Sequence, residues 1–193
     1  MAAVVFLNAT GNTPAPAVGP SSRRSLGEPS AAVVVREYAD YQCPSCGAFA
    51  RNVEPQLRQA YIDTGRIRFE FYDFAWIGPE SRDAANAARC AGAQDSFWPY
   101  HDLLYRNQAG ENAGAFTRDR LKAFGRELGL DPATFDRCVD GETFASAVQA
   151  DLADARNQGF TGTPTFLIGG QRIVGAQPFT VFQAAIDAAL AGG

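Results

Sequence analysis

The stretch Tyr41-Gln42-Cys43-Pro44-Ser45-Cys46-Gly47-Ala48-Phe49 decides the fold that this sequence predicts. It follows an apolar run at residues 31–38 that is typical of a buried strand, and it opens a helical pattern that continues to about Ile62. Two cysteines separated by two residues therefore stand at a strand-to-helix junction. Pro44 suits the first helical position, because the N–H that proline lacks would have no partner there.

This junction favours a reactive thiol on Cys43. A thiolate at the N-cap position faces the unpaired N–H groups of the first turn and the positive end of the helix dipole. Such surroundings lower the pKa of a cysteine from about 8.5 into a range of roughly 3.5 to 7.5. Cys46, one turn further on, would be shielded by the helix and placed to attack a mixed disulfide on Cys43. We interpret the pair as a redox couple.

A Cys-X-X-Cys motif has two alternative interpretations: half of a zinc site, or an inert structural disulfide. Zinc usually needs a second cysteine pair or a histidine pair. The other cysteines, Cys90 and Cys138, are isolated, and His101 is the single histidine of the chain. We therefore predict neither a metal nor a cofactor.

The composition sets outer bounds on the function. The 193 residues fit one domain with a sizeable insertion or two small domains. A net charge of −4 without any basic stripe disfavours nucleic acid as a partner. No apolar run approaches the roughly 20 residues of a membrane span. Four cysteines, an even number, are compatible with an oxidising compartment.

The N-terminal residues 1–27 are expected to be a flexible leader. Residues 8–30 are rich in Pro, Gly, Ala, Ser and Asn, a composition that cannot bury enough surface to order itself. The apolar residues 2–7 are too few for the core of a signal peptide, and no Lys or Arg precedes them. We favour a tether to a membrane for this leader.

The first part of the chain predicts a βαβ unit with parallel strands. A strand at 32–38 leads into a helix at 45–62 that Pro55 should kink, and a second strand follows at 66–72. By alternation Glu37 shares a face with Val33 and Val35. Its carboxyl is either paired in the interior, or poised near the cysteines with a raised pKa, or turned to solvent at the strand end.

The middle of the chain, residues 79–142, predicts only helices and forms an all-helical insertion. His101 lies in one of these helices, and we expect it to be a packed or capped residue rather than a catalytic one. The remaining segments, 28–78 and 143–193, form the α/β domain. Its second half should contain a helix over 143–158, a hairpin turning at Gly169-Gly170, and a last helix from Pro178.

This order of elements resembles the DsbA family of thiol-disulfide oxidoreductases, which have a thioredoxin fold with an inserted helical domain. The resemblance covers about residues 26–191 and rests on two motifs, Glu37-Tyr38-Ala39-Asp40-Tyr41-Gln42-Cys43-Pro44-Ser45-Cys46 and Gly162-Thr163-Pro164-Thr165-Phe166. The motif is similar to that of the bacterial branch with Cys-Pro-Ser-Cys sites. The fold class that it implies is α/β.

The resemblance also implies roles for five residues of the two motifs. Cys43 would be the exposed nucleophile and Cys46 the resolving thiol. Pro164 matches the cis-proline of the family, and Thr163 the preceding residue, whose backbone aligns the substrate. Glu37 matches the buried acid.

Two further expectations come from relatives in this family. They often carry a second cysteine pair in the insert, which implies a structural disulfide between Cys90 and Cys138; two free buried thiols are the alternative. The strongly oxidising relatives carry His where this chain has Ser45. A hydroxyl can donate to a thiolate but brings no positive charge, so a milder oxidant is expected.

The function that the resemblance implies is the introduction of disulfides into exported proteins outside the cytoplasm, in the periplasm or cell envelope. The expected partners are reduced, unfolded exported proteins and a membrane or small-molecule reoxidant, and the chain is expected to be a monomer. The alternatives are a disulfide isomerase or reductase and a non-catalytic, chaperone-like binding module. A glutathione-transferase-like isomerase is disfavoured by the cysteine pair, and a thiol peroxidase by the lack of a Thr and an Arg beside Cys43.

Overall fold

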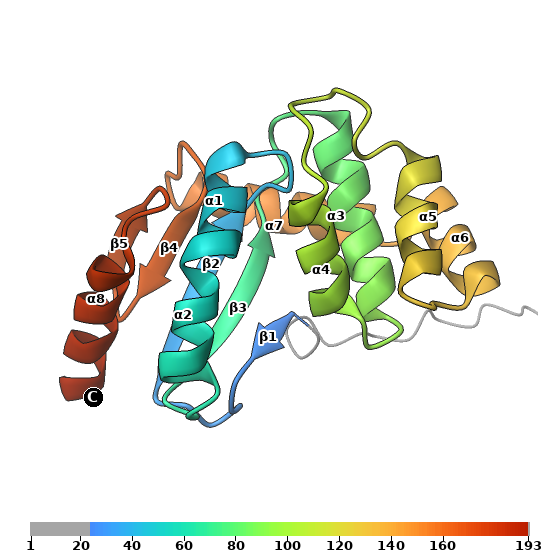
Figure 1. The fold of residues 1–193 in the computed structure, drawn as a ribbon. Coiled ribbons are helices and arrows are strands. Elements are labelled where there is room, and N and C mark those ends of the chain that lie inside the picture. Colours follow the sequence, from blue (N-terminus) through green and yellow to red (C-terminus); the bar gives the residue numbers. More distant parts are fainter. Residues whose placement is uncertain (1–23, 193) are drawn as a thin grey trace, which may run out of the picture.

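A five-stranded mixed sheet forms the centre of the computed structural model, which describes residues 24–192 (Figure 1). The strand order is β1-β3-β2-β4-β5; β2 and β3 are parallel, and the other neighbours are antiparallel. The strands are β1 (Ser25–Leu26), β2 (Val33–Ala39), β3 (Ile67–Asp73), β4 (Thr165–Ile168) and β5 (Gln171–Val174).

Helices follow in the predicted order. They are α1 (Pro44–Asn52), α2 (Glu54–Leu57), the π-helical turn η1 (Arg58–Ile62), α3 (Pro79–Gly92), α4 (Phe97–Arg106), α5 (Arg118–Glu127), α6 (Pro132–Asp140), α7 (Ala145–Asn157) and α8 (Phe179–Ala191). The long helix expected at 45–62 is interrupted at Val53, two residues before Pro55. Pro55 cannot donate to the carbonyl one turn earlier, which accounts for the break that its position predicts.

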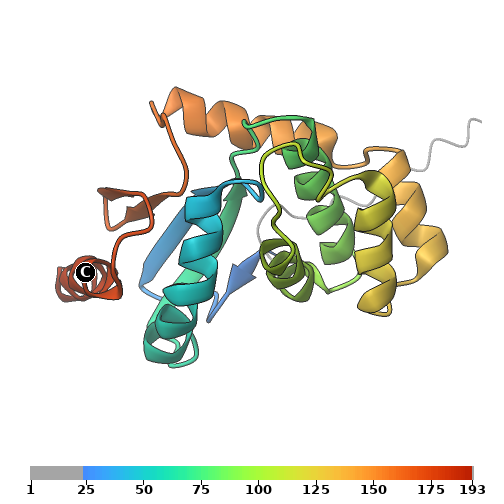
Figure 2. The ribbon, with the colours of Figure 1, turned by 45° about the horizontal axis from the view of Figure 1, so that its top comes forward.

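Alternation along β2 divides the core between the two faces of the sheet. Val33 and Val35 pack with Phe49 of α1 and Ile186 of α8 in one buried cluster. Tyr38 points the other way, into a cluster that includes Leu152 of α7. Figures 1 and 2 accordingly show α1 and α8 on one side of the sheet and α7 crossing the opposite side.

The leader expected over residues 1–27 needs a correction at its end. Ser25 and Leu26 form β1, which pairs antiparallel with Glu70 and Phe69 at the edge of the sheet. Arg24 is buried as well, and its guanidinium donates to Asp151 Oδ2 at 2.6 Å. A strand of two residues has no hydrophobic period, so composition alone could not separate it from the leader. Residues 1–23 lie outside the described part of the chain.

Helices α3–α6 lie beside the sheet (Figure 1), and their buried aromatic side chains belong to the same cluster as Phe69 and Phe71 of β3. Tyr100 of α4 packs against Phe135 of α6 and donates to the carbonyl of Leu121 at 2.8 Å. Cys90 of α3 and Cys138 of α6 are joined by a disulfide, with 5.9 Å between their Cα atoms. These helices are therefore packed against one another and against the sheet.

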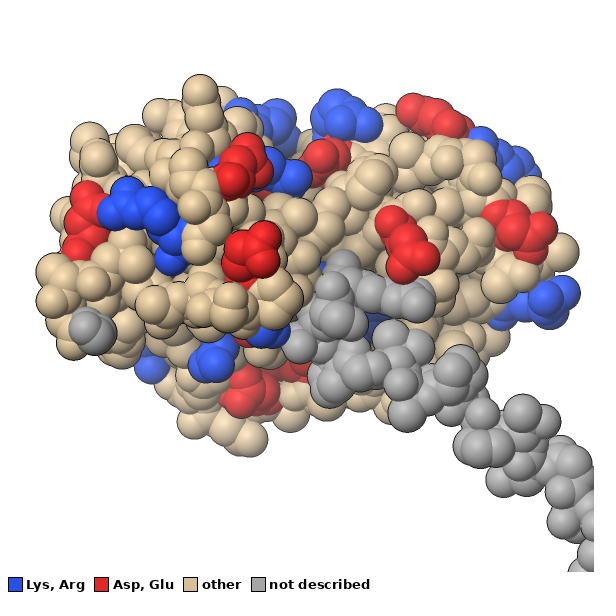
Figure 3. All heavy atoms as spheres, turned by 90° about the horizontal axis from the view of Figure 1, so that it is seen from below, with Lys and Arg blue, Asp and Glu red and all other residues tan. Residues whose placement is uncertain are grey.

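Charges of both signs are interspersed over the surface seen in Figure 3, with uncharged atoms between them. Among the described helices, none combines the length and the apolar character needed to cross a lipid bilayer.

Candidate active site

Cys43 occupies the N-cap of α1, and Pro44 is the first helical residue. The thiol of Cys43 donates to the carbonyl oxygen of Thr163 at 3.4 Å, which joins the start of α1 to the loop before β4. The residue is only 8% exposed, so the exposure that the resemblance implied for this nucleophile is wrong: Cys43 is nearly buried against the Thr163 loop.

The surroundings of Cys43 lower the pKa of its thiol to about 6. The largest cause is a hydrogen bond from the thiol of Cys46; burial opposes it, and the side chain of Thr163 and the backbone N–H groups of Cys46 and Ser45 lower the pKa further. The N–H groups at the helix start, which the sequence analysis took as the main cause, contribute less than the Cys46 thiol does. Ser45 contributes through its backbone.

Cys46 has the opposite electrostatic environment. It is fully buried, and burial together with Cys43 and Glu37 raises the pKa of its thiol well above the usual value. One thiol of the pair is therefore poised as an anion near neutral pH, and the other holds its proton. Both are free thiols in the structure.

The peptide bond between Thr163 and Pro164 is cis, as the resemblance implied for this position. Two contacts hold this loop: Thr165 donates its hydroxyl to the carbonyl of Gly162 at 2.7 Å, and Gly175 N–H donates to the carbonyl of Pro164 at 2.8 Å. The Trp76 indole donates to the Thr163 hydroxyl at 3.4 Å. Trp76 itself is 47% exposed beside the cysteine pair.

Glu37 is 1% exposed, so the interpretation as a solvent-facing residue at the strand end is wrong. Neither of its carboxylate oxygens has a hydrogen-bond partner within residues 24–192. Burial, the charge of Glu54 and the charge of Cys43, in that order, raise the pKa of Glu37 well above its usual value. The carboxyl therefore keeps its proton to a higher pH than an ordinary glutamate, and its ionisation is coupled electrostatically to both cysteines.

Asp40 is a site residue that the sequence analysis missed. Its carboxylate is buried and accepts from Gln42 N–H at 2.8 Å and from the Ser81 hydroxyl at 2.6 Å through one oxygen. The other oxygen accepts from the backbone N–H groups of Trp76 and Ile77 at 2.9 and 3.1 Å. Asp40 thereby fixes the loop before Cys43 against the loop that carries Trp76. An aspartate directly after a buried strand was the available signal.

His101 is completely buried, in agreement with its expected role as a packed residue. Its Nδ1 lies 3.3 Å from the Tyr41 hydroxyl and its Nε2 lies 3.4 Å from Glu54 Oε2. Asp102 brings a further carboxylate within 4.8 Å of this pair. Arg58 donates to the other Glu54 oxygen at 2.5 Å and already compensates its charge, so we assign no metal to the cluster.

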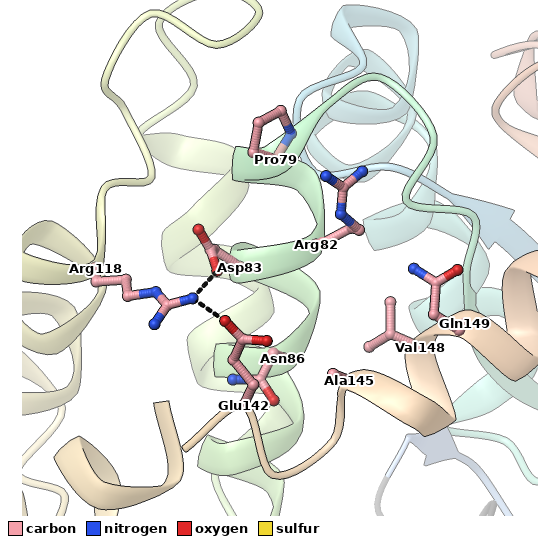
Figure 4. Close-up of a pocket in the computed structure, with 9 residues that line it drawn as sticks. All are labelled: Pro79, Arg82, Asp83, Asn86, Arg118, Glu142, Ala145, Val148 and Gln149. Carbon is pink, nitrogen blue, oxygen red and sulfur yellow. Dashed lines mark hydrogen bonds and ion pairs between the residues drawn. The ribbon is translucent and has the colours of Figure 1, made fainter. Parts of the chain in front are cut away.

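A hollow of about 350 Å³ lies between α3, the start of α5 and the start of α7 (Figure 4). Arg118 crosses it and pairs with Asp83 and with Glu142, as the dashed lines in Figure 4 show. None of the cysteines lines this hollow. The hollow is a polar contact region between α3, α5 and α7, and none of its lining residues is a cysteine or serine nucleophile.

A low-pKa thiol at a helix start, a buried second thiol and a cis-proline beside them define a thiol-disulfide oxidoreductase. The chain belongs to the thioredoxin family, whose model matches residues 21–188, and within it to the DsbA-like oxidoreductases. The predicted fold class, family and type of activity are thus confirmed.

Two relatives support this assignment. The chain is 30% identical to disulfide bond formation protein D of Bacillus subtilis over 170 residues, which are 86% of this chain and 77% of that protein. The crystal structure of oxidised BdbD from Bacillus subtilis superposes with a TM-score of 0.82 at 30% identity, covering 88% of this chain and 93% of that one. Wolbachia pipientis alpha-DsbA1 shares the fold, with a TM-score of 0.79 at 23% identity over 93% and 94% of the two chains.

Proposed function

We propose that this oxidoreductase introduces disulfides into exported proteins by exchange through Cys43 and Cys46. In its oxidised form, a substrate thiolate attacks the sulfur of Cys43, a mixed disulfide forms, and Cys46 leaves and takes up a proton. A second substrate thiolate then attacks the substrate sulfur and releases the Cys43 thiolate. The substrate loses two electrons and two protons, and the enzyme holds them as two thiols until a reoxidant accepts them.

The observation that carries this proposal is the asymmetry between the two thiols. Cys43 has a lowered pKa of about 6, and the pKa of Cys46 is raised by burial. A thiol of low pKa is a good leaving group, and stabilisation of the reduced form makes a disulfide a stronger oxidant. Cys43 is therefore suited to release an oxidised substrate and not to retain it.

The residues around the pair are proposed to act in distinct ways. Glu37 exchanges a proton with Cys46, since it is a buried acid with a raised pKa and its ionised form raises the pKa of Cys46 in turn. Thr163 and Pro164 align the backbone of the substrate beside Cys43. Ser45 supplies an N–H to the Cys43 thiolate without adding positive charge, which favours an oxidant milder than its His-bearing relatives.

The surface beside the cysteines suits an unfolded substrate. Trp76 and Val174 are 47% and 54% exposed, and both adjoin the loop with the cis-proline: Trp76 through Thr163, Val174 by pairing with Thr165. An extended chain on Thr163 could place apolar side chains on these two residues, whereas a folded protein has buried such side chains. We propose reduced, unfolded proteins as substrates for this reason.

The compartment proposed is outside the cytoplasm, in the periplasm or cell envelope. The disulfide between Cys90 and Cys138 supports it, because structural disulfides persist in oxidising compartments. A membrane-bound or small-molecule oxidant would accept the electrons there. We further propose a monomer, because both cysteines and the cis-proline loop beside them come from one chain.

The test compares oxidation with isomerisation. The protein is expected to oxidise a reduced substrate with several cysteines faster than it rescues a scrambled one. Its reduction potential should lie above the roughly −270 mV of thioredoxin. A potential like that of thioredoxin would identify a reductase, and efficient rescue by a stable dimer an isomerase. Retention of substrate protection after loss of both cysteines would identify a chaperone-like module.

A further inference from the structure

The loop between α4 and α5, residues 107–117, lies against the loop that carries Cys43. Gln108 makes the closest connection: its side-chain Nε2 donates to the carbonyl of Tyr41 at 2.7 Å and to the carbonyl of Cys43 at 3.0 Å. One amide thus holds the two carbonyls on either side of Gln42. The inserted domain thereby contacts the backbone of the redox site directly.

The orientation of the Gln108 amide is fixed by Arg51 of α1. The Arg51 guanidinium donates to the carbonyl of Tyr105 at 2.8 Å and to Gln108 Oε1 at 3.4 Å. A guanidinium can only donate, and the two backbone carbonyls can only accept. The oxygen of the Gln108 amide must therefore face Arg51 and its nitrogen must face Tyr41 and Cys43.

Gly47 provides the space that Gln108 occupies. A Cβ atom on this residue would lie 2.0 Å from Gln108 Oε1, well inside van der Waals contact. The N–H of Gly47 donates to the carbonyl of Cys43 at 3.1 Å, which is the first hydrogen bond of α1. Gln108 thus shares the Cys43 carbonyl with the first turn of the helix.

A second connection is made through Gln42, the residue directly before Cys43. Gln42 exchanges two hydrogen bonds with Asn112 of the same loop, accepting from its N–H and donating to its Oδ1, the latter at 3.3 Å. Gln42 also donates to Ser81 at 2.8 Å. The loop at 107–117 is therefore attached to the active-site loop at two points, and only Gln108 reaches the carbonyl of the nucleophile.

We propose that Gln108 is a positioning residue that sets the redox equilibrium of the Cys43–Cys46 pair from the inserted domain. It holds the Tyr41 and Cys43 carbonyls, so the first turn of α1 keeps the N–H groups of Ser45 and Cys46 directed at the Cys43 sulfur. These groups stabilise the thiolate and hence the reduced form. The proposal rests on the exchange function of Cys43 proposed above.

Other groups that face the Cys43 sulfur are kept in every variant of the test. They are the Cys46 thiol from α1, the Glu37 carboxyl from β2, and Thr163 from the loop with the cis-proline. Gln108 does not touch the sulfur in the structure, and it carries no charge. Its influence must therefore act through the backbone of the first turn.

The first experiment replaces Gln108 by Met, which has a similar length but cannot donate, and by Glu, which keeps the shape but repels the carbonyls. The equilibrium constant against glutathione and the pH titration of thiolate absorbance are measured for both. We expect the equilibrium to move by roughly threefold to tenfold toward the oxidised protein, in line with the loss of one to two hydrogen bonds. The thiolate titration should move to higher pH, most for Glu.

A matched control separates this effect from lost stability. Gln94 of the insert bonds its side chain to the backbone N–H and carbonyl of Asp131, at 2.8 and 3.5 Å, with no contact to the redox site. Gln94→Met should lower thermal stability to a similar degree as Gln108→Met and leave the glutathione equilibrium unchanged. An equal redox change in both variants would overturn the proposal.

A second experiment displaces the Gln108 side chain by a substitution in α1. Gly47→Ala should push the flexible end of Gln108 away and reproduce the redox change. In a Gln108→Ala background, Gly47→Ala should add little, because only the flexible end of Arg51, 2.8 Å from the added Cβ, is left to move. Additive changes in the double variant would contradict the proposal.

The wild-type protein distinguishes failure of this inference from failure of the proposed function. If wild-type Cys43 titrates as an ordinary thiol and exchanges no disulfides, the proposed function itself is wrong. If the wild type is an active oxidant and all Gln108 variants keep its equilibrium, only the role of Gln108 is refuted.

Discussion

The sulfur of Cys43 lies 3.4 Å from the carbonyl oxygen of Thr163, a residue 120 positions further along the chain. The cis bond between Thr163 and Pro164 follows that carbonyl directly. A substrate that binds along the Thr163 backbone must therefore pass beside the Cys43 sulfur. This relationship makes the roles of the two cysteines separable by experiment.

The exchange roles predict different trapping by the two single variants. Cys46→Ser should accumulate mixed disulfides with reduced substrate proteins, because Cys43 can react but nothing resolves the adduct. Cys43→Ser should trap none, since Cys46 is fully buried and its raised pKa keeps it protonated. Non-reducing gel electrophoresis after acid quenching measures the mixed disulfides of both variants. Equal trapping by the two variants would contradict the assigned roles of Cys43 and Cys46.

The pH dependence of Cys43 reactivity follows from its lowered pKa. Only the thiolate is alkylated, so the rate should rise with pH through about 6 and become level above about 7. An unperturbed cysteine would give a midpoint near 8.5. Because the Cys46 thiol is the largest cause of the shift, Cys46→Ala should move the midpoint upward. Cys46→Ser keeps a hydrogen-bond donor and should move the midpoint less. A midpoint near pH 8 in the wild type would contradict the lowered pKa of Cys43.

Glu37 should link the stability of the protein to pH in an unusual direction. Its folded pKa is raised above the unfolded value of about 4.3, so the native state binds more protons in that range. Stability should therefore fall as pH rises from about 4 toward the raised pKa. In Glu37→Gln this fall should be reduced, as measured by urea unfolding of the oxidised proteins at several pH values.

The same variant tests the proton exchange with Cys46. Glu37→Gln should fold but release its mixed disulfide more slowly than the wild type. Glu70→Gln on the neighbouring strand is the control, since that carboxylate accepts from Arg36 and Tyr72 on the other face of the sheet. Equal release rates in the wild type and Glu37→Gln would leave Glu37 without the proposed role.

Local patterns were sufficient to predict most of the elements. The alternation at 66–72, the glycine pair of the hairpin and the kink at Pro55 each depend on residues close in sequence, and each feature was found within two residues of its expected position. The edge strand β1 was missed because its two residues are ordered by pairing with β3, a contact across more than 40 positions.

The sequence predicted a site residue only where a reactive side chain occupies a recognisable place in a predicted element. Cys43 and Cys46 could be identified from the sequence, because two cysteines at this spacing lie at the start of a predicted helix. Asp40 and Gln108 have ordinary surroundings in the sequence, and their importance comes from contacts with Ser81 and with the Cys43 carbonyl, 41 and 65 positions away. Such contacts depend on how the insert docks on the sheet, which no local pattern encodes.

The disulfide between Cys90 and Cys138 should stabilise the protein without taking part in exchange. It closes a loop with a sequence separation of 48, for which the chain-entropy model gives about 4 kcal/mol. The double variant Cys90→Ala/Cys138→Ala should lose up to about that free energy of unfolding and keep the trapping behaviour of the wild type. Mild reduction of the native protein should expose two titratable thiols, from Cys43 and Cys46, because Cys90 is only 1% exposed. Four free thiols in the untreated protein, or an unchanged free energy of unfolding in the double variant, would show that this bond does not stabilise the insert.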